Sequence, residues 1–398
     1  MTEMSIVNSI EARLPALRQL RQTLHAHPEL GFAEHRTGDL IAAELERLGI
    51  ACHRGIGKTG LVGVIEGKRR TSGRAIGLRA DMDALPLHEQ TALPYASCCP
   101  GRMHACGHDG HVTMLLAAAG YLSETRAFDG TVYLVFQPGE EGYAGAREMV
   151  NDGLFDRFPV EQVYALHNWP TLPLGTLSIA PGPAMAATDR LEIEIFGVGG
   201  HGGVSPHKCV DPVLVAGHVI TAVQSIVSRN VPALDAAVIS LCAIQGGQMD
   251  GFAVIPDSVK IVGTARSLTA EMQTLLERRL HEVVQGVASA FGARASVTYE
   301  RLFPMTVNDA EAAAFATDVA VELFGRAQVV ARPQPSLGGE DFAFMLQRRP
   351  GAYVHFGTGS PAGGDHGLHS PHFDFNDAAI PLGGAYLARL AERALPVA

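Results

Sequence analysis

The spacing of apolar residues changes along the chain, and this change divides the chain into segments. Near the start, apolar residues recur every three or four positions, as on one face of a helix, at Leu14, Leu17, Leu20 and Leu24. Residues 191–196 (Leu-Glu-Ile-Glu-Ile-Phe) instead alternate between apolar and acidic, which is typical of an antiparallel strand with one face in water. The alternating texture is confined to the middle of the chain.

The two outer segments are predicted to combine helices with short buried strands. Helices are expected at 10–25, 37–48, 111–122, 310–324 and 376–395, and strands at 61–65, 75–80, 131–136, 162–166 and 353–356. The middle segment predicts strand 191–196, helix 212–227, strands 237–244 and 258–265, helix 270–291 and strand 295–301. This β-α-β-β-α-β order is typical of a ferredoxin-like unit. We therefore predict a two-domain α/β protein, with one domain formed by 1–187 and 305–398 and a second inserted at 188–304.

Composition narrows the class of protein. The chain has 398 residues, of which 47% are hydrophobic, and its 31 basic and 41 acidic residues give a net charge of −10. An acidic chain without basic runs argues against nucleic acid and against an anionic membrane as partners. No apolar run reaches the length of a membrane span, and the first ten residues lack the pattern of a secretion signal. The six cysteines are scattered, without the spacing of a disulfide framework. These features predict a cytoplasmic protein with no membrane partner.

Acidic and histidine residues follow the ends of three predicted strands. Asp81 and Asp83 follow the first, Glu140 and Glu141 the second, and His167 the third. Each has an ordinary explanation by itself: a solvated turn, an exposed acidic pair, or a structural histidine. Because α/β sheets place their sites at the carboxyl ends of strands, the three together indicate a site. A nearby cation would relieve the repulsion between the adjacent glutamates.

The stretch 103–111 holds one Cys, three His and one Asp. Thiolate and imidazole groups at such short spacing are typical of a transition-metal site. A hydrolytic two-metal site needs roughly four to six protein ligands and a general base that is not a ligand. The candidate ligands are Cys106, His108, Glu141, His167 and His369, and Glu140 is then the candidate general base.

Two other readings of the motifs are weaker. Cys106 with His104 or His108 resembles a cysteine nucleophile and its base, but that leaves Glu140 and the other candidate ligands without a role. Residues 197–202 match G-x-G-x-x-G after a strand, yet Pro206 interrupts the helix that a dinucleotide site requires.

Several motifs occur in an order that resembles a known family. They lie at 79–86, 103–111, 137–142, 165–168 and 368–373. Together they resemble the M20 metallopeptidase family over essentially the whole chain. The resemblance is greatest to its amidohydrolase branch, which includes hippurate hydrolases, N-acyl-L-amino acid amidohydrolases and the plant indole-acetyl-amino acid hydrolases.

The resemblance implies a catalytic domain that binds two divalent metal ions (Zn, Mn, Co or Ni) and an inserted lid domain that mediates dimerisation. It implies a homodimer or a dimer-based homo-oligomer, with Cys106, His108, Glu141, His167 and His369 as metal ligands and Glu140 as general base. Asp83 would orient the site, His201 of the lid would reach a substrate or oxyanion position, and Asp81 is left open. The spacing from His201 to His207 is one residue longer than in the family, which bears on the substrate pocket.

The expected function is metal-dependent hydrolysis of the amide bond of N-acyl amino acids, a class of small-molecule substrate. A carboxypeptidase or dipeptidase on the same metal site is an alternative. A non-catalytic metal-binding or ligand-binding protein on a retained fold is a third hypothesis, which the presence of Glu140 beside a full ligand set disfavours.

Overall fold

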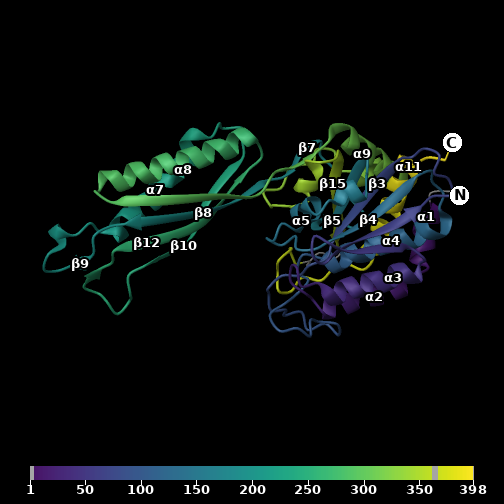
Figure 1. The fold of residues 1–398 in the computed structure, drawn as a ribbon, viewed down its shortest axis with the longest axis horizontal. Helices are drawn as coiled ribbons and strands as arrows, with labels where there is room; N and C mark the ends of the chain where they lie inside the picture. Colours follow the sequence, from purple (N-terminus) through teal and green to yellow (C-terminus); the bar gives the residue numbers. More distant parts are fainter. Residues whose placement is uncertain (1–3, 361–365, 398) are drawn as a thin grey trace. The chain divides into compact units, whose positions relative to one another are not determined.

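The computed structural model describes residues 4–360 and 366–397, and the chain forms two compact units. The first unit comprises Met1–Ala184, Thr306–Gln334 and Asp341–Ala398, and the second comprises Met185–Met305 and Pro335–Glu340. The first unit is thus built from both ends of the chain, and the second carries helices α7 and α8 (Figure 1).

A mixed seven-stranded sheet forms the centre of the first unit, in the order β1-β2-β4-β3-β5-β15-β6. The neighbours β4, β3, β5 and β15 run parallel, whereas β1, β2 and β6 pair antiparallel. The strands are β1 (Ala51–Ile56), β2 (Gly60–Glu66), β3 (Ala75–Asp81), β4 (Thr131–Gln137), β5 (Gln162–Pro173), β6 (Leu177–Ser178) and β15 (Gly351–Gly359). The sequence did not predict β1, an edge strand that is mostly exposed and lacks an apolar pattern.

The register of the parallel strands decides where the polar residues meet. Asp81 of β3 lies opposite Gln137 of β4, and His355 of β15 lies opposite His167 of β5. The residues that follow β3 and β4 therefore emerge at one edge of the sheet, beside β5. The prediction that His167 follows the end of its strand was wrong, because β5 continues to Pro173.

Helices and short elements complete the first unit. They are α1 (Met4–Glu11), α2 (Leu14–Ala26), α3 (His35–Arg47), α4 (His108–Thr125), α5 (Gly145–Asn151), α6 (Leu154–Arg157), α9 (Ala310–Phe324), α10 (Ala343–Leu346), α11 (Ala379–Ala394), β7 (Gly182–Met185), β14 (Thr306–Asn308) and the 3₁₀ turn η2 (Arg326–Gln328). The single helix predicted at 10–25 is two helices, because Pro15, which has no amide hydrogen to donate, stands in the first turn of α2. Helix α4 is buried from His108 to Leu122, and α11 approaches it so closely that a Cβ at Gly383 would lie 2.1 Å from Met114 Sδ.

The second unit has a four-stranded antiparallel sheet in the order β10-β12-β8-β13, with α7 and α8 packed on it. Its elements are β8 (Ala187–Phe196), β9 (Gly200–His201), η1 (Pro206–Lys208), α7 (Pro212–Asn230), β10 (Ala237–Gly246), β11 (Val254–Ile255), β12 (Ser258–Ser267), α8 (Ala270–Ala290) and β13 (Arg294–Phe303). Leu191, Ile193 and Ile195 are fully buried, as the alternating pattern predicts. The strand order and connections are ferredoxin-like, which confirms the predicted fold class.

The segment after β8 does not form a dinucleotide-binding turn. Residues Gly200–His201 form the short strand β9, paired with β11, and a 3₁₀ turn begins at Pro206. No helix begins at Gly202, where a G-x-G-x-x-G site would need one.

Helix α7 bears on the expectation that no apolar run reaches the length of a membrane span, and polar residues such as His218 and Gln224 interrupt its apolar ones. Among the described residues it alone is long and apolar enough to cross a membrane, with 33% of its length buried. One such helix is weak evidence, since core helices of soluble proteins meet the same criterion. Its face that carries Val215, Val219 and Val223 belongs to the core of the second unit.

The buried Arg21 joins three parts of the first unit. From α2, its guanidinium lies 3.4 Å from Asp109 of α4, 3.0 Å from Asp374 and 2.8 Å from Asp377, both of which precede α11. Asp109 also contacts His25 Nδ1 at 2.9 Å. Burial alone would lower the pKa of His25, but hydrogen bonds with Asp109 and Glu89 outweigh this and raise the pKa to about 9. Arg21 and His25 thus supply the positive charge that the carboxylates around the start of α4 require.

Replacing Arg21 by Met should lower the free energy of unfolding by about 3–5 kcal/mol, the range for breaking a buried ion pair from one side. The substitution keeps an apolar stem of similar length but leaves Asp109 without the guanidinium that lies 3.4 Å away. Urea unfolding can be followed by the fluorescence of Trp169, the single Trp of the chain, which belongs to the same unit.

The matched control is Arg18→Met on the same helix. The Arg18 side chain is 50% exposed and lies 3.2 Å from Asp377, so its loss should cost less than about 1 kcal/mol. Equal losses in the two variants would contradict the role given to Arg21.

Candidate active site

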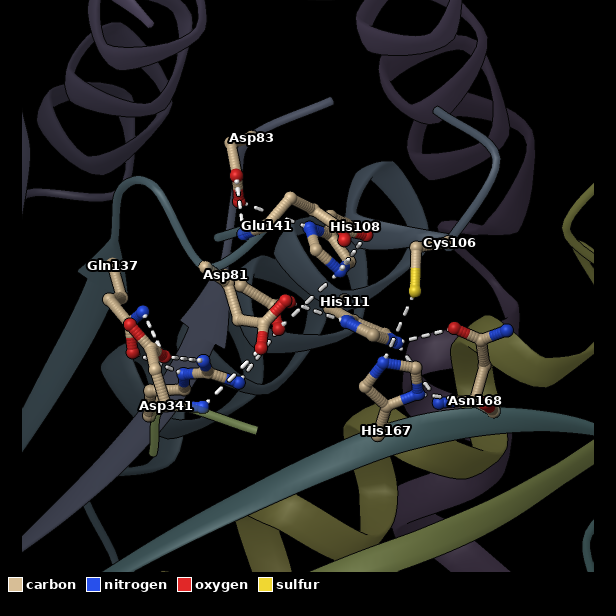
Figure 2. Close-up of polar contacts among 12 residues, drawn as sticks. Asp81, Asp83, Cys106, His108, His111, Gln137, Glu141, His167, Asn168 and Asp341 are labelled. Atoms are coloured by element: carbon tan, nitrogen blue, oxygen red, sulfur yellow. Dashed lines mark hydrogen bonds and ion pairs between the residues drawn. The ribbon is translucent and has the colours of Figure 1, made fainter. Parts of the chain in front are cut away.

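The five predicted metal ligands lie together in the first unit. They come from the loop before α4 (Cys106), the first residue of α4 (His108), the loop after β4 (Glu141), strand β5 (His167) and the loop before α11 (His369). Figure 2 shows the side chains of four of them, Cys106, His108, Glu141 and His167, in one cluster.

The spacing of the ligand atoms suits a metal ion. Cys106 Sγ lies 3.6 Å from His167 Nε2, and Glu141 Oε1 lies 3.3 Å from His369 Nε2 and 3.9 Å from His108 Nε2. Two ligand atoms that share one zinc ion at ordinary bond lengths lie roughly 3–4 Å apart. These pairs therefore have the separation that a shared cation would need.

Two buried polar atoms in this cluster have no hydrogen-bond partner among the described residues. They are His108 Nε2 and Glu141 Oε1, which face each other. A buried polar atom without a partner costs about 1–3 kcal/mol. A divalent cation held between these two atoms would remove that cost, so the residues present fit a metal ion.

Hydrogen bonds fix which ring nitrogen of each histidine faces the cluster. His108 Nδ1 lies 3.2 Å from Asp83 Oδ1, and His167 Nδ1 lies 2.8 Å from the carbonyl oxygen of Asn168. Both Nδ1 atoms therefore donate, and the Nε2 lone pairs are left for a metal. Burial and the nearby His111 hold the pKa of His167 well below its ordinary value, which keeps it in the neutral form that binds metals.

Cys106 is a buried thiol beside acidic groups. Burial and the carboxylates of Glu141 and Glu140 raise its pKa well above the ordinary value. The ligand form of cysteine is the thiolate, so a bound cation would have to displace this proton. Metal binding at this cluster should therefore release a proton.

His369 reaches the cluster from a strained segment. Its side chain is 56% exposed, its φ of 64° lies in the left-handed region, and its backbone N–H donates to the carbonyl oxygen of Ala105 at 2.8 Å. Left-handed backbone is uncommon for a residue other than glycine and occurs often at functional sites. The hydrogen bond ties the His369 loop to the residue before Cys106.

Glu140 lies beside the predicted ligands. It is 7% exposed, and a carboxylate oxygen of Glu140 lies within 4.8 Å of ligand atoms of both His108 and Glu141. Its Oε1 accepts a hydrogen bond from the backbone N–H of Asp341 at 3.3 Å. The adjacent Glu140 and Glu141 thus direct their carboxylates into one cluster, as a general base and its neighbouring ligand would.

Comparisons with known proteins show the family of this chain. The family model described as peptidase family M20/M25/M40 matches residues 77–393. This chain belongs to that family. A hippurate hydrolase of Campylobacter jejuni is 41% identical over 94% of this chain and 95% of its own, and an N-acetyl-L-cysteine deacetylase of Bacillus subtilis is 40% identical over 94% and 87%. The crystal structure of the Bacillus subtilis YXEP protein, described as a dinuclear metal-binding peptidase of family M20, has a TM-score of 0.82 and 35% identity, covering 97% of this chain and 99% of that one.

Family membership confirms the resemblance to M20 and to its amidohydrolase branch. It also confirms the expected class of enzyme, a metal-dependent amidohydrolase. The role of each site residue stays a prediction, to which the structure adds geometry.

The two aspartates of the M20 motif at 79–86 have different surroundings. Asp83 contacts His108 Nδ1 through Oδ1 and accepts the backbone N–H of Glu141 through Oδ2 at 3.0 Å, so it holds two predicted ligands. Asp81 lies 2.7 Å from Arg79 and 2.5 Å from His111 Nδ1. Burial would raise the pKa of Asp81, but Arg79, His108 and His111 together hold it well below the ordinary value.

His111 lies close enough to His108 and His167 to be a fourth candidate in one metal group. However, its Nδ1 contacts Asp81, and its Nε2 lies 2.9 Å from the backbone N of Asn168. Both ring nitrogens therefore have protein partners, and we regard His111 as a support for the ligands.

Sequence reasoning missed the buried group around Arg79. Its guanidinium contacts Asp81, Gln137 at 2.8 Å and Asp341 at 3.3 Å, and so joins β3, β4 and the segment before α10. An arginine inside an otherwise apolar strand at 75–80 was the available signal, since arginine is rarely buried without a partner.

His201, the predicted substrate or oxyanion residue, belongs to the second unit. It lies on β9 and is exposed, and its Nδ1 accepts hydrogen bonds from the backbone N–H groups of Gly203 at 3.1 Å and Val204 at 3.2 Å. These contacts leave Nε2 to carry the proton. The catalytic role of His201 stays a prediction.

Replacing Asp83 by Asn should weaken metal binding about 10–100-fold, the usual effect of losing a carboxylate that supports metal ligands. One amide oxygen cannot accept from both His108 Nδ1 and the N–H of Glu141, which lie at 3.2 and 3.0 Å from the two carboxylate oxygens. Metal affinity can be measured by competition with a chelator and by elemental analysis after dialysis.

Asp39→Asn is the control, because the side chain of Asp39 is 69% exposed on α3. If Asp83→Asn bound metal as tightly as this control, the supporting role of Asp83 would be refuted.

Proposed function

We propose that this M20 enzyme hydrolyses the amide bond between an acyl group and the nitrogen of an amino acid, with two divalent ions bound by Cys106, His108, Glu141, His167 and His369. The observation that carries the proposal is the buried Glu140 carboxylate within 4.8 Å of two predicted ligands. The relatives named as a hippurate hydrolase and an N-acetyl-L-cysteine deacetylase support this substrate class.

The chain supplies the proton transfers and the orientation. When bound, the ions would lower the pKa of water and polarise the substrate carbonyl. The Glu140 carboxylate takes a proton from the attacking water and returns it to the amide nitrogen as the C–N bond breaks. His201, protonated on Nε2, is the candidate donor to the carbonyl oxygen.

The ligand set restricts the metal. One thiolate and three imidazoles favour zinc, while the carboxylate of Glu141 leaves Mn, Co and Ni as candidates.

We place the enzyme in the cytoplasm, since all six cysteines are free thiols.

Replacing Glu140 by Gln should leave bound metal unchanged but lower kcat by about 10²–10⁴-fold, because the amide keeps the shape of the side chain but cannot accept the proton. The substrates are N-acetyl and N-benzoyl amino acids, together with dipeptides and peptides with a free carboxyl end. Glu66→Gln on β2, where the side chain is 50% exposed, is the matched control.

The same panel separates the alternatives. A preference for peptides over N-acyl amino acids would favour a carboxypeptidase or dipeptidase on the same site. Near wild-type kcat in Glu140→Gln would remove Glu140 as the base. Absence of hydrolysis with metal fully bound would favour a non-catalytic binding protein.

We also propose that the second unit forms a homodimer through strand β10. This strand is an edge of its sheet, and from Cys242 to Gly246 its side chains are exposed, including Ile244 at 53%. Val213 and Leu214, near the start of α7, are also about half exposed, at 48% and 53%. An apolar exposed edge strand is a template for pairing with another copy, and twofold symmetry would pair β10 with itself.

Ile244→Lys should convert the dimer to a monomer in sedimentation velocity, since a charge on an edge strand blocks strand pairing. Thr298→Lys on β13, the opposite edge of the same sheet, should leave the dimer intact. A monomeric wild type, or a dimer that survives in both variants, would overturn this assignment.

A further inference from the structure

Trp169 lies next to a predicted metal ligand on the same strand. It follows His167 by two positions in β5, and residues two apart in a strand point to the same face. Their ring centroids are 6.1 Å apart at an interplanar angle of 70°. The indole therefore borders the metal cluster on the face that His167 occupies.

A second aromatic ring supports Trp169 from the neighbouring strand. His355 of β15 stacks on the indole with centroids 4.0 Å apart and an interplanar angle of 23°. His355 is itself buried, which holds its ring in place against the indole. The pair forms a stacked aromatic surface beside the site.

The exposure of the three rings differs. His167 and His355 are 5% and 6% exposed, whereas Trp169 is only partly buried. An aromatic ring that is stacked on a buried neighbour and is itself partly exposed suits contact with a flat apolar group, because aromatic rings prefer stacked or edge-to-face contacts.

We propose that Trp169, backed by His355, contacts the acyl group of the substrate and selects planar apolar acyl groups such as benzoyl over acetyl. The inference rests on the proposed amidohydrolase function and adds the chemical class of the acyl group. The alternative is that Trp169 only fills space at the edge of the site.

The first test compares two substrates in variants of Trp169. In Trp169→Leu the ratio of kcat/KM for N-benzoylglycine to that for N-acetylglycine should fall about tenfold or more, the range for losing an apolar contact in a pocket. Trp169→Phe should keep most of the ratio, because it keeps an aromatic face. An unchanged ratio in both variants would overturn the proposal.

The matched control is Phe291→Leu in the second unit. Phe291 also stacks on a histidine, His218, with centroids 4.6 Å apart and an angle of 25°. Loss of this ring should leave the substrate ratio unchanged. A similar fall in the control would show that the effect of Trp169→Leu is general destabilisation and would count against the proposal.

The second test does not depend on turnover. Because Trp169 is the single Trp, its emission reports directly on what binds beside it. N-benzoylglycine added to metal-loaded Glu140→Gln protein should change the emission saturably, and N-acetylglycine should do so at least tenfold more weakly. If wild type hydrolyses no N-acyl amino acid of the panel, the proposed function fails, while this titration still decides whether Trp169 binds an aromatic acyl group. No saturable change with N-benzoylglycine would overturn the inference.

Discussion

Buried carboxylates at one edge of the central sheet need compensating positive charge, and the site depends on how the chain supplies it. Arg79 compensates Asp81 and Asp341, and Arg21 compensates Asp109 together with the carboxylates before α11. Glu141 instead faces the rings of His108 and His369 at 3.9 and 3.3 Å. The two arginines therefore neutralise the carboxylates that support the site. The position beside Glu141 suits a metal cation, because an isolated charge is costly to bury.

Each arginine also joins segments that are distant in sequence. Arg79 connects β3 and β4 to Asp341, and Arg21 connects α2 to the start of α4 and to the loop that follows His369. Through these links, segments that carry predicted ligands are fixed to one another before any ion binds. Such pre-organisation lowers the entropy cost of assembling a site from separate loops.

The main helices and strands and the cluster of candidate ligands could be predicted from the sequence, because their signals are local. Apolar period located the main strands and helices, and ligand types at short spacing located the metal cluster. The sequence prediction failed where the structure depends on distant partners. Strand β5 continues past Leu166 because β15 pairs with it as far as Pro173. The buried networks of Arg21 and Arg79 join residues up to several hundred positions apart. The placement of His201 depends on the second unit and on a substrate, so its role stays a prediction.

Strand β5 shows how chemistry and selectivity can be separated within a few residues. His167 faces the ligand cluster, while Asn168 contacts His111 and lies against Gly107, where a Cβ would be 2.4 Å from Asn168 Oδ1. Gly107 has a φ of 89° and separates the predicted ligands Cys106 and His108, so Asn168 helps to hold the loop that carries them. Trp169 then returns to the face of His167. If Trp169 contacts the acyl group as proposed, a change there would alter that contact while Asn168 keeps the loop of the predicted ligands in place.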